Sequence, residues 1–422
     1  MPSDEKNRGW IVPAVLAGAC AFAVAWLASQ LVPSSAFFAR YEVWFEGDLH
    51  RVYDNLVDRQ SNHYRSKVHP LFSIVGYVMV WVPRRLLSID PVVSVRIIGA
   101  LMAFVWGALL FALLRAITRS NAASFLFTLA GVASASFLFW ASVPETYIFG
   151  SISILAAMLV AALSLRSEWL TTGVIAATLS FTITNAMAGL ATAITTLPWR
   201  RAVQAAANAL CIVVILWGVQ KFIIPSTQFF LGDKEEKDYL YRVDGKRAAE
   251  VTRSFAITSM VMPVVVKQKV YYQPELVMFT QPSRIGRGGA LEWSAAVIWC
   301  ALLLLGVGGL WQASELRVLR IALLLTIAGQ LALHLVYGEE TFLYSLHFAP
   351  LLLVLAAFGA RTRARPVVFA LVVALIVTAG ITNWQRFTEA CQYLAKPAPQ
   401  NLTSRAGSIR TASEIHRQYP GT

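Results

Sequence analysis

The chain alternates long apolar blocks with short polar connections, and this pattern predicts a bundle of membrane-spanning helices. Eleven apolar blocks fall near residues 10–32, 92–114, 122–142, 147–165, 170–185, 186–198, 202–224, 292–312, 318–337, 346–360 and 366–384. A block of about 18 or more apolar residues can cross a bilayer as a helix. We therefore expect an all-α integral membrane protein with about eleven transmembrane helices, in which the short blocks near 170–198 are broken helices.

The basic residues between these blocks set the expected orientation of the chain. With the N-terminus in the cytoplasm, every basic cluster between spans falls on the cytoplasmic side: Arg115 with Arg119, Arg166, Arg200 with Arg201, Arg317 with Arg320, and Arg361 with Arg363 and Arg365. This agrees with the excess of lysine and arginine in cytoplasmic loops. Counting the shorter segment Leu71–Pro83 as a span would reverse the later clusters. We therefore expect that segment to lie in the membrane interface or to re-enter the membrane.

The same topology places the longer polar connections on the outer side of the membrane. The transmembrane module covers residues 1–384 and has juxtamembrane helices and loops on its outer face, and a short outer tail follows at 385–422. The outer loops are 33–91, 143–147, 225–291 and 338–345. Within the third, residues 255–266 form an amphipathic stretch that we expect to lie on the membrane. Acidic and histidine residues concentrate in these loops, which indicates chemistry at the outer face.

Composition supports a membrane protein and excludes other classes. Apolar residues make up 57% of the chain and charged residues only 14%, and the mean hydropathy is +0.59. A soluble domain carries about 25% charged residues, so a soluble enzyme is excluded. The net charge of +13 comes mostly from basic residues that flank spans, and no basic stripe with interleaved aromatics predicts nucleic-acid binding. The four cysteines are far apart and predict neither a disulfide framework nor a zinc site.

Three carboxylates on the outer side are candidates for catalysis. Glu46 and Asp48 are separated by one glycine and follow the first span, and Glu145 lies in the tight turn between two spans. A carboxylate beside a low-dielectric region can act as a general base, and the first pair can also hold a divalent cation through its oxygens. The plainer alternatives are a solvated loop for the pair and a helix N-terminal contact for Glu145.

Basic residues on the outer side are candidates for binding a phosphate group. They are Arg65, Lys67 and His69 in the first loop, and Lys267, Lys269, Arg284 and Arg287 in the long loop. Such side chains bind phosphate oxygens through charge-assisted hydrogen bonds. The glycines at 286, 288 and 289 add a turn whose backbone N–H groups can also bind an anion. The alternative is that these residues contact the anionic headgroups of membrane lipids.

The last outer connection carries a further polar group. Glu340, Tyr344 and His347 follow one another between two apolar blocks, and we interpret them as part of a substrate pocket. His334 lies inside the preceding block and is expected to be a packed, hydrogen-bonded histidine.

These motifs, taken in order, resemble the GT-C superfamily of integral-membrane glycosyltransferases, nearest to its branch of lipid A aminoarabinose transferases and protein O-mannosyltransferases. The matching motifs are Glu46-Gly-Asp48, His69-Pro70-Leu71, Pro144-Glu145-Thr146 and the stretch from Phe342 to Pro350. The resemblance covers the order of spans over most of residues 10–384. This chain departs from the family at Thr184-Asn185-Ala186, where a Lys-Gly pair often stands, so the usual phosphate-binding lysine has no counterpart there.

The resemblance implies a GT-C-type bundle that moves a sugar from a polyprenyl-phosphate donor to a hydroxyl acceptor on a protein, lipid or glycan. Asp48 would be the general base, basic side chains would stabilise the departing phosphate, and the anomeric carbon would be inverted. Members that use a monophosphate donor need no cofactor, and those that use a diphosphate donor need a divalent cation, which stays an alternative here. The expected location is a bacterial inner membrane, with the active site facing the periplasm and membrane lipids around it.

The main rival function is a membrane transporter or a flippase for lipid-linked sugars. That function predicts ionisable residues near the middle of the bilayer and paired interrupted helices. Arg96 and His334 are the candidates inside apolar blocks, whereas the acids lie at the outer rim, which favours a transferase. A non-catalytic assembly protein is a third alternative.

Overall fold

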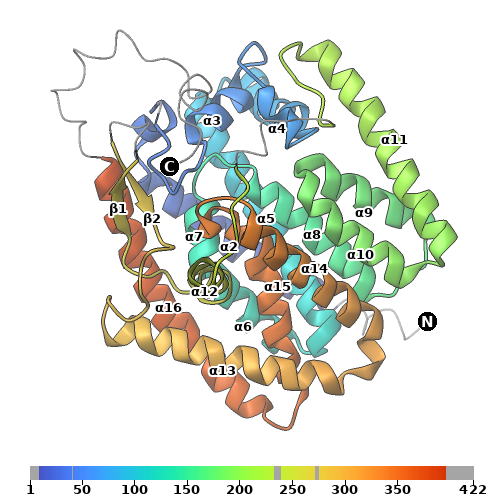
Figure 1. Ribbon diagram of the computed structural model, residues 1–422, viewed down its shortest axis with the longest axis vertical. Coiled ribbons are helices and arrows are strands. Elements are labelled where there is room, and N and C mark those ends of the chain that lie inside the picture. Colours follow the sequence, from blue (N-terminus) through green and yellow to red (C-terminus); the bar gives the residue numbers. More distant parts are fainter. Residues whose placement is uncertain (1–8, 40, 232–238, 271–274, 396–422) are drawn as a thin grey trace.

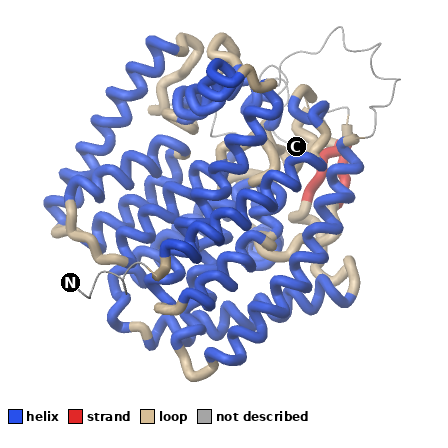
Figure 2. The backbone as a smooth tube through the Cα atoms, turned by 180° about the vertical axis from the view of Figure 1, so that it is seen from behind, coloured by secondary structure: helices blue, strands red, loops and turns tan. Residues whose placement is uncertain are grey.

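The chain folds into a helical bundle with one small hairpin (Figure 1). The computed structural model describes residues 9–39, 41–231, 239–270 and 275–395. Its helices are α2 (Ile11–Leu31), α3 (Leu49–Val57), α4 (Phe72–Leu87), α5 (Pro91–Thr118), α6 (Asn121–Val132), α7 (Ala135–Trp140), α8 (Tyr147–Ala162), α9 (Glu168–Phe181), α10 (Ala186–Thr196), α11 (Trp199–Ile223), α12 (Gly245–Arg253), α13 (Ala290–Gln312), α14 (Arg317–Val336), α15 (Ser345–Ala357) and α16 (Arg365–Leu394). Strands β1 (Val266–Lys269) and β2 (Leu276–Phe279) pair antiparallel at one edge of the bundle (Figure 2).

Seven helical segments of the described chain are long and apolar enough to cross a membrane. They are Ile11–Leu31, Pro91–Thr118, Trp199–Ile223, Ala290–Gln312, Ser314–Val336, Thr341–Arg361 and Arg365–Leu394. Large apolar side chains remain exposed on the outer helices, such as Phe222 at 89% and Leu304 at 74%, as expected of surfaces that face lipid. The all-α, multi-pass membrane class is therefore confirmed.

The expected number of eleven spans is not confirmed. Each predicted apolar block contains a helix, but the four blocks between residues 122 and 198 hold shorter ones. The first of these blocks is interrupted before α7, where the Ser134 side chain accepts the backbone N–H of Phe137 and caps the new helix. The last two are separated by a tight turn at Ile183–Asn185, between α9 and α10.

Helix α15 forms the centre of the bundle. Every residue from Ser345 to Ala357 is buried, which matches a helix that is apolar on all sides. The neighbouring helix α13 approaches it closely through Gly306, because a Cβ there would overlap the carbonyl oxygen of Leu355. Small residues at helix contacts are the usual means of close packing inside a membrane.

Two polar clusters lie at opposite ends of α14 and α15. At one end, Arg361 donates to the Ile117 carbonyl oxygen at 2.6 Å and pairs with Glu315, which also lies 3.9 Å from Arg119. At the other end, Tyr337 follows α14 and the segment from Glu340 precedes α15. Of the arginines expected on one side, Arg119 and Arg361 thus lie together at one end, and the candidate acid Glu340 lies at the other.

Three sequence-based boundaries differ from the structure. The expected interfacial segment Leu71–Pro83 is the longer helix α4, and Arg84 at its C-terminal end donates to the Val57 carbonyl oxygen of α3 at 2.7 Å. The stretch 255–266 is not a surface helix, because Met260, Val261 and Met262 are buried in the core. The tail expected from 385 begins as part of α16, which ends at Leu394, and residues 396–422 lie outside the described residues.

We predict that Gly306→Ala lowers the free energy of unfolding by about 1–3 kcal/mol, because the added methyl group overpacks the α13–α15 contact. Gly308→Ala is the matched control on the same helix, since its Cβ would meet no atom within 4 Å. There the change is expected to be neutral or slightly stabilising, as alanine is the better helix former. Thermal unfolding in detergent measures both variants, and equal behaviour would contradict the packing model.

Candidate functional site

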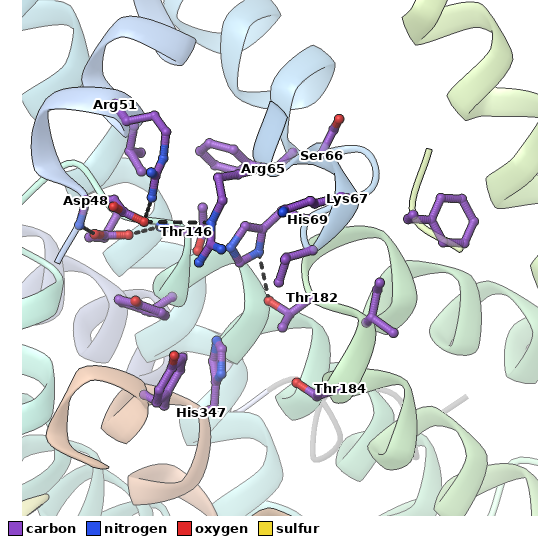
Figure 3. A pocket seen from close by; sticks show the side chains of 18 of the residues that line it. Asp48, Arg51, Arg65, Ser66, Lys67, His69, Thr146, Thr182, Thr184 and His347 are labelled. Carbon is purple, nitrogen blue, oxygen red and sulfur yellow. Dashed lines mark hydrogen bonds and ion pairs between the residues drawn. The ribbon is translucent and has the colours of Figure 1, made fainter. Parts of the chain in front are cut away.

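A cavity of about 300 Å³ lies at the end of the bundle where the candidate acids gather (Figure 3). Its wall is formed by α3, the segment before α4, the start of α8, the turn after α9, the end of α14 and the start of α15. Seven of the candidate catalytic, phosphate-binding and pocket residues line it together: Asp48, Glu145, Arg65, Lys67, His69, Tyr344 and His347. The cavity therefore joins motifs that are far apart along the chain.

Asp48 is positioned by a strained turn just before α3. Phe45 and Glu46 both adopt left-handed backbone conformations, with φ of 51° and 60°, which are uncommon for residues other than glycine. The buried side chains of Trp44 and Phe45 anchor this turn in the core. At the start of α3, the Asp48 carboxylate pairs with Arg51 and lies 3.9 Å from Nε of Arg65. These two cations favour the ionised carboxylate.

Glu145 connects this turn to the rest of the bundle. One of its carboxylate oxygens accepts the backbone N–H of Asp48 at 2.6 Å, and the other accepts that of Thr146 at 3.1 Å. Gly47 permits this approach, because a Cβ there would meet the Trp44 carbonyl oxygen at 2.9 Å and the Glu145 carboxylate at 3.2 Å. Burial raises the pKa of Glu145 to about 7. Its geometry is that of a residue that positions Asp48.

Three basic side chains line the part of the cavity that is formed by α3 and by the segment before α4. Arg51 donates to the Tyr64 hydroxyl and lies over the Tyr64 ring, 5.0 Å from its centroid. Lys67 is only 5% exposed, and its Nζ lies 5.6 Å from the same ring. Arg65 completes the group beside Asp48. These three basic side chains outnumber the two carboxyl groups that line the cavity, Asp48 and Glu145, so this part of the wall suits an anionic ligand such as a phosphate.

His69 is fixed by the broken end of α9. Its Nδ1 donates to the Phe181 carbonyl oxygen at 2.6 Å, so Nε2 carries the lone pair. The backbone beside it is held to the same helix end, because Leu71 N–H donates to Ser180 at 2.9 Å. Burial, together with Arg65, lowers the pKa of His69 to about 3. His69 is therefore neutral at physiological pH, and its Nε2 is able to accept a hydrogen bond.

Glu46 and Glu340 are not among the residues that line the cavity. Glu46 shares a hydrogen bond with the exposed Glu339, and burial and this neighbouring acid raise its pKa to about 9. An acid that stays protonated at neutral pH cannot act as a general base there. Glu340 is fully buried and accepts from Thr280 N–H at 2.8 Å and from the Thr280 hydroxyl at 2.6 Å. It therefore joins the segment after β2 to the start of α15.

The basic residues of the long loop lie outside the cavity lining. Lys267 and Lys269 are exposed on β1, where Nζ of Lys267 lies 4.1 Å from the ring centroid of Tyr393. Arg284 and Arg287 are also exposed.

The glycine-rich turn beside them is already occupied by the protein's own side chains. The Gly286 N–H donates to the Glu292 carboxylate at 2.6 Å, and a Cβ at position 288 would overlap that carboxylate.

Two cavity residues were missed or misread in the sequence. Arg51 received no role, although its position three residues after Asp48 places it on the same helical face. His334 was expected to be hydrogen-bonded, yet neither ring nitrogen has a partner among the described residues. It lines the cavity near the end of α14. Arg96 was the other ionisable residue inside an apolar block, the kind of residue that a transporter predicts. Its side chain donates to the Val32 carbonyl oxygen at 2.8 Å, beside the end of α2.

Comparison with protein-family models, with curated proteins and with solved structures finds no match to this chain. The chemistry of the cavity must therefore be inferred from its own residues. Asp48 is able to accept a proton, and Arg51, Arg65 and Lys67 are able to bind an anion. The wall formed by α14 and α15 carries neutral polar groups. The Glu46 and Asp48 carboxylates point to different partners, Glu339 and Arg51, so they do not form one set of metal ligands.

We predict that Glu46→Gln flattens the fall in stability that accompanies rising pH. The folded state keeps a proton on Glu46 up to pH about 9, whereas the unfolded chain releases it near 4.5. The stability from this proton is present below pH 4.5 and is lost as the pH rises toward 9. Glutamine carries no such proton, so the melting temperature of the variant should fall less between pH 6 and 9.

The control for this prediction is Asp58→Asn, at an exposed acid that caps the Gln60 backbone N–H. Asparagine can make the same bond, so the pH profile of this variant should match that of the wild-type protein. A Glu46→Gln profile parallel to the wild-type profile would contradict the protonated state of Glu46.

Proposed function

We propose that this protein is a glycosyltransferase that moves a sugar from a polyprenyl-phosphate donor to a hydroxyl acceptor. The observation that carries the proposal is one cavity that combines Asp48 with Arg51, Arg65 and Lys67 at the end of an apolar helical bundle. A donor of this kind is an anion attached to a membrane-embedded chain. It requires a cationic pocket that is reached from the membrane surface.

The proposed reaction is a single displacement at the anomeric carbon. Asp48 accepts the proton of the acceptor hydroxyl while that oxygen bonds to the anomeric carbon. The bond from this carbon to the phosphate oxygen breaks, and its electron pair leaves with the phosphate. The products are the glycosylated acceptor and polyprenyl phosphate, with the configuration of the anomeric carbon inverted.

The cations around the cavity would act on the leaving group. Negative charge grows on the phosphate as the bond breaks, so fixed donors from Arg51, Arg65 and Lys67 stabilise the transition state more than the ground state. The two arginines stay charged under all physiological conditions and can each donate two parallel hydrogen bonds to phosphate. The order of motifs resembles the GT-C superfamily, and this resemblance supports the same reaction.

The proposed setting is a bacterial inner membrane with the cavity facing the periplasm. One end of the bundle carries Arg119, Arg361 and Arg365. The positive-inside rule assigns such an end to the cytoplasm, and the cavity lies at the opposite end. The acceptor is then a protein, lipid or glycan on the periplasmic side, and the surrounding membrane lipids supply the donor.

We predict that Asp48→Asn lowers the turnover of a polyprenyl-phosphate sugar by about 10²–10⁴-fold, the usual contribution of a general base. Asparagine keeps the shape of the side chain but does not accept the acceptor's proton. Release of polyprenyl phosphate by purified protein measures the effect. Glu46→Gln is the matched control in the same turn, and it should stay within a few-fold of wild type. Unchanged turnover in Asp48→Asn would remove Asp48 from the mechanism.

We predict that Lys67→Ala weakens donor affinity by about ten- to a hundredfold, because a charge-assisted hydrogen bond contributes roughly 1.5–3 kcal/mol. Lys269→Ala is the control, since this lysine is exposed on β1 outside the cavity lining. Measurement in detergent without anionic lipid separates a phosphate ligand from a headgroup contact. A loss of affinity in Lys269→Ala but not in Lys67→Ala would move the phosphate to the long loop.

A further inference from the structure

The part of the cavity formed by α14 and α15 contains buried polar atoms without hydrogen-bond partners among the described residues. His334 is 2% exposed, and neither of its ring nitrogens has a partner. His347 is equally buried, and its Nε2 also lacks one. Buried polar atoms in native proteins are nearly always hydrogen-bonded, so unpaired ones that face a cavity indicate a missing ligand.

A glycine of α8 lets two polar side chains beside the cavity pack close to the backbone. A Cβ at Gly150 would lie 2.5 Å from Nε2 of His347 and 2.7 Å from Nδ2 of Asn185, which is also buried and unpartnered. Gln330 lines the cavity beside them and donates to Asn185 Oδ1 at 3.3 Å. Gln330, His334 and His347 thus form a polar floor from α14 and α15, and Asn185, in the turn before α10, lies behind it.

Among the residues that the structure describes, this floor has no acid and no lysine or arginine. The charged residues that line the cavity, histidines aside, are Asp48, Arg51, Arg65, Lys67 and Glu145, and all belong to the segments before α4 and before α8. The lining from the turn after α9, α14 and α15 comprises Thr182, Ile183, Thr184, Gln330, Leu333, His334, Tyr337, Tyr344 and His347. Figure 3 shows the same separation, with His347 and Thr184 on the other side of His69 from Arg51.

Aromatic rings complete the floor. The His334 ring stacks on Tyr344 at a centroid distance of 4.9 Å, and Tyr147 contacts both Tyr344 and His347 edge-on. A wall of flat rings with a few fixed polar atoms is the usual composition of a small-molecule site. It matches a ring that has both apolar C–H surfaces and hydroxyl groups.

We propose that this floor, defined by Gln330, His334, Tyr344 and His347, binds a neutral sugar ring whose polar groups are hydroxyls. The proposal rests on the proposed function, since it assigns the sugar part of the donor to the floor and the phosphate to the cations. Hydroxyl groups both donate and accept, so they can satisfy imidazole and amide nitrogens alike.

An ammonium or carboxylate on the sugar would lose its hydration here without an opposite charge from the floor. The donor sugar is therefore a neutral hexose or pentose rather than an amino sugar or a uronic acid. This conclusion separates the chain from transferases that act on a charged sugar.

Equilibrium binding to the purified full-length protein in detergent tests the proposal independently of turnover. The probes are bare polyprenyl phosphate and the same lipid carrying glucose, mannose, arabinose, 4-amino-4-deoxyarabinose or galacturonic acid. At least one neutral sugar should bind tenfold or more tightly than the bare lipid, and the charged sugars should not. Tighter binding of a charged sugar, or no gain from any neutral sugar, would overturn the proposal.

Two substitutions assign the gain to the floor. His334→Leu and Gln330→Met should each weaken binding of the neutral-sugar donor by about five- to tenfold, the usual effect of one lost neutral hydrogen bond. Binding of the bare lipid phosphate should not change, which also shows that each variant is folded. Lys67→Ala, in contrast, should weaken the binding of both the bare lipid phosphate and the neutral-sugar donor. If His334→Leu and Gln330→Met weaken the binding of both ligands equally, the floor supports the structure of the cavity and does not bind the sugar.

Turnover separates this proposal from the function on which it rests. Absence of donor cleavage with every sugar, together with preferential binding of a neutral sugar, would refute the transferase but keep the sugar site. Cleavage of only the charged donors would keep the transferase and refute the neutral sugar site.

Discussion

The structure depends on one constraint, which is that backbone groups freed by a broken helix must find partners inside the protein. No water is present in the bilayer core to replace a lost hydrogen bond, so irregular backbone is tolerated only where the chain itself or a cavity satisfies it. Where α9 ends, the freed carbonyl groups of Ser180 and Phe181 are satisfied by Leu71 N–H and by the His69 ring. The bond that repairs the helix end also fixes the orientation of His69 at the cavity. In the same way, Asn383 donates to the Ala133 carbonyl oxygen at 2.8 Å where α6 ends.

Glu145 shows how the same constraint connects fold and chemistry. Its carboxylate accepts two backbone N–H groups, one from its own turn and one from Asp48, although the two segments are 97 residues apart. These bonds offset part of the cost of burial, yet burial still raises the pKa of the group to about 7. Protonation near neutral pH would weaken the acceptor that holds the Asp48 turn. A positioning residue of this kind couples the geometry of the base to pH even though it does not contact the reacting atoms.

The positions of the helices could be predicted from the sequence, because long apolar blocks have few other structures available to them. Their interruptions could not be predicted as well, since a serine such as Ser134 occurs within spans as well as at caps. Within the site, Asp48, Glu145, Lys67 and His69 were recognisable as polar residues in short connections between apolar blocks. Glu340 was misplaced for a physical reason: a buried carboxylate that satisfies backbone N–H groups has the same local sequence as one that faces a cavity.

The division of the cavity into a charged and a neutral half has a consequence for the proposed reaction. A phosphate drawn to the cations and a sugar ring held by the neutral floor would place the bond between them at the boundary of the two halves. His69 lies at this boundary in Figure 3, with Asp48 and Arg51 on one side and His347 on the other. Burial lowers the pKa of His69 to about 3, so the ring stays neutral and its Nε2 lone pair can accept a hydrogen bond from a hydroxyl group. A protonated imidazole there would instead attract the phosphate and draw it away from Lys67. The neutral state of His69, which follows from its burial beside Arg65, therefore keeps the two halves of the cavity distinct.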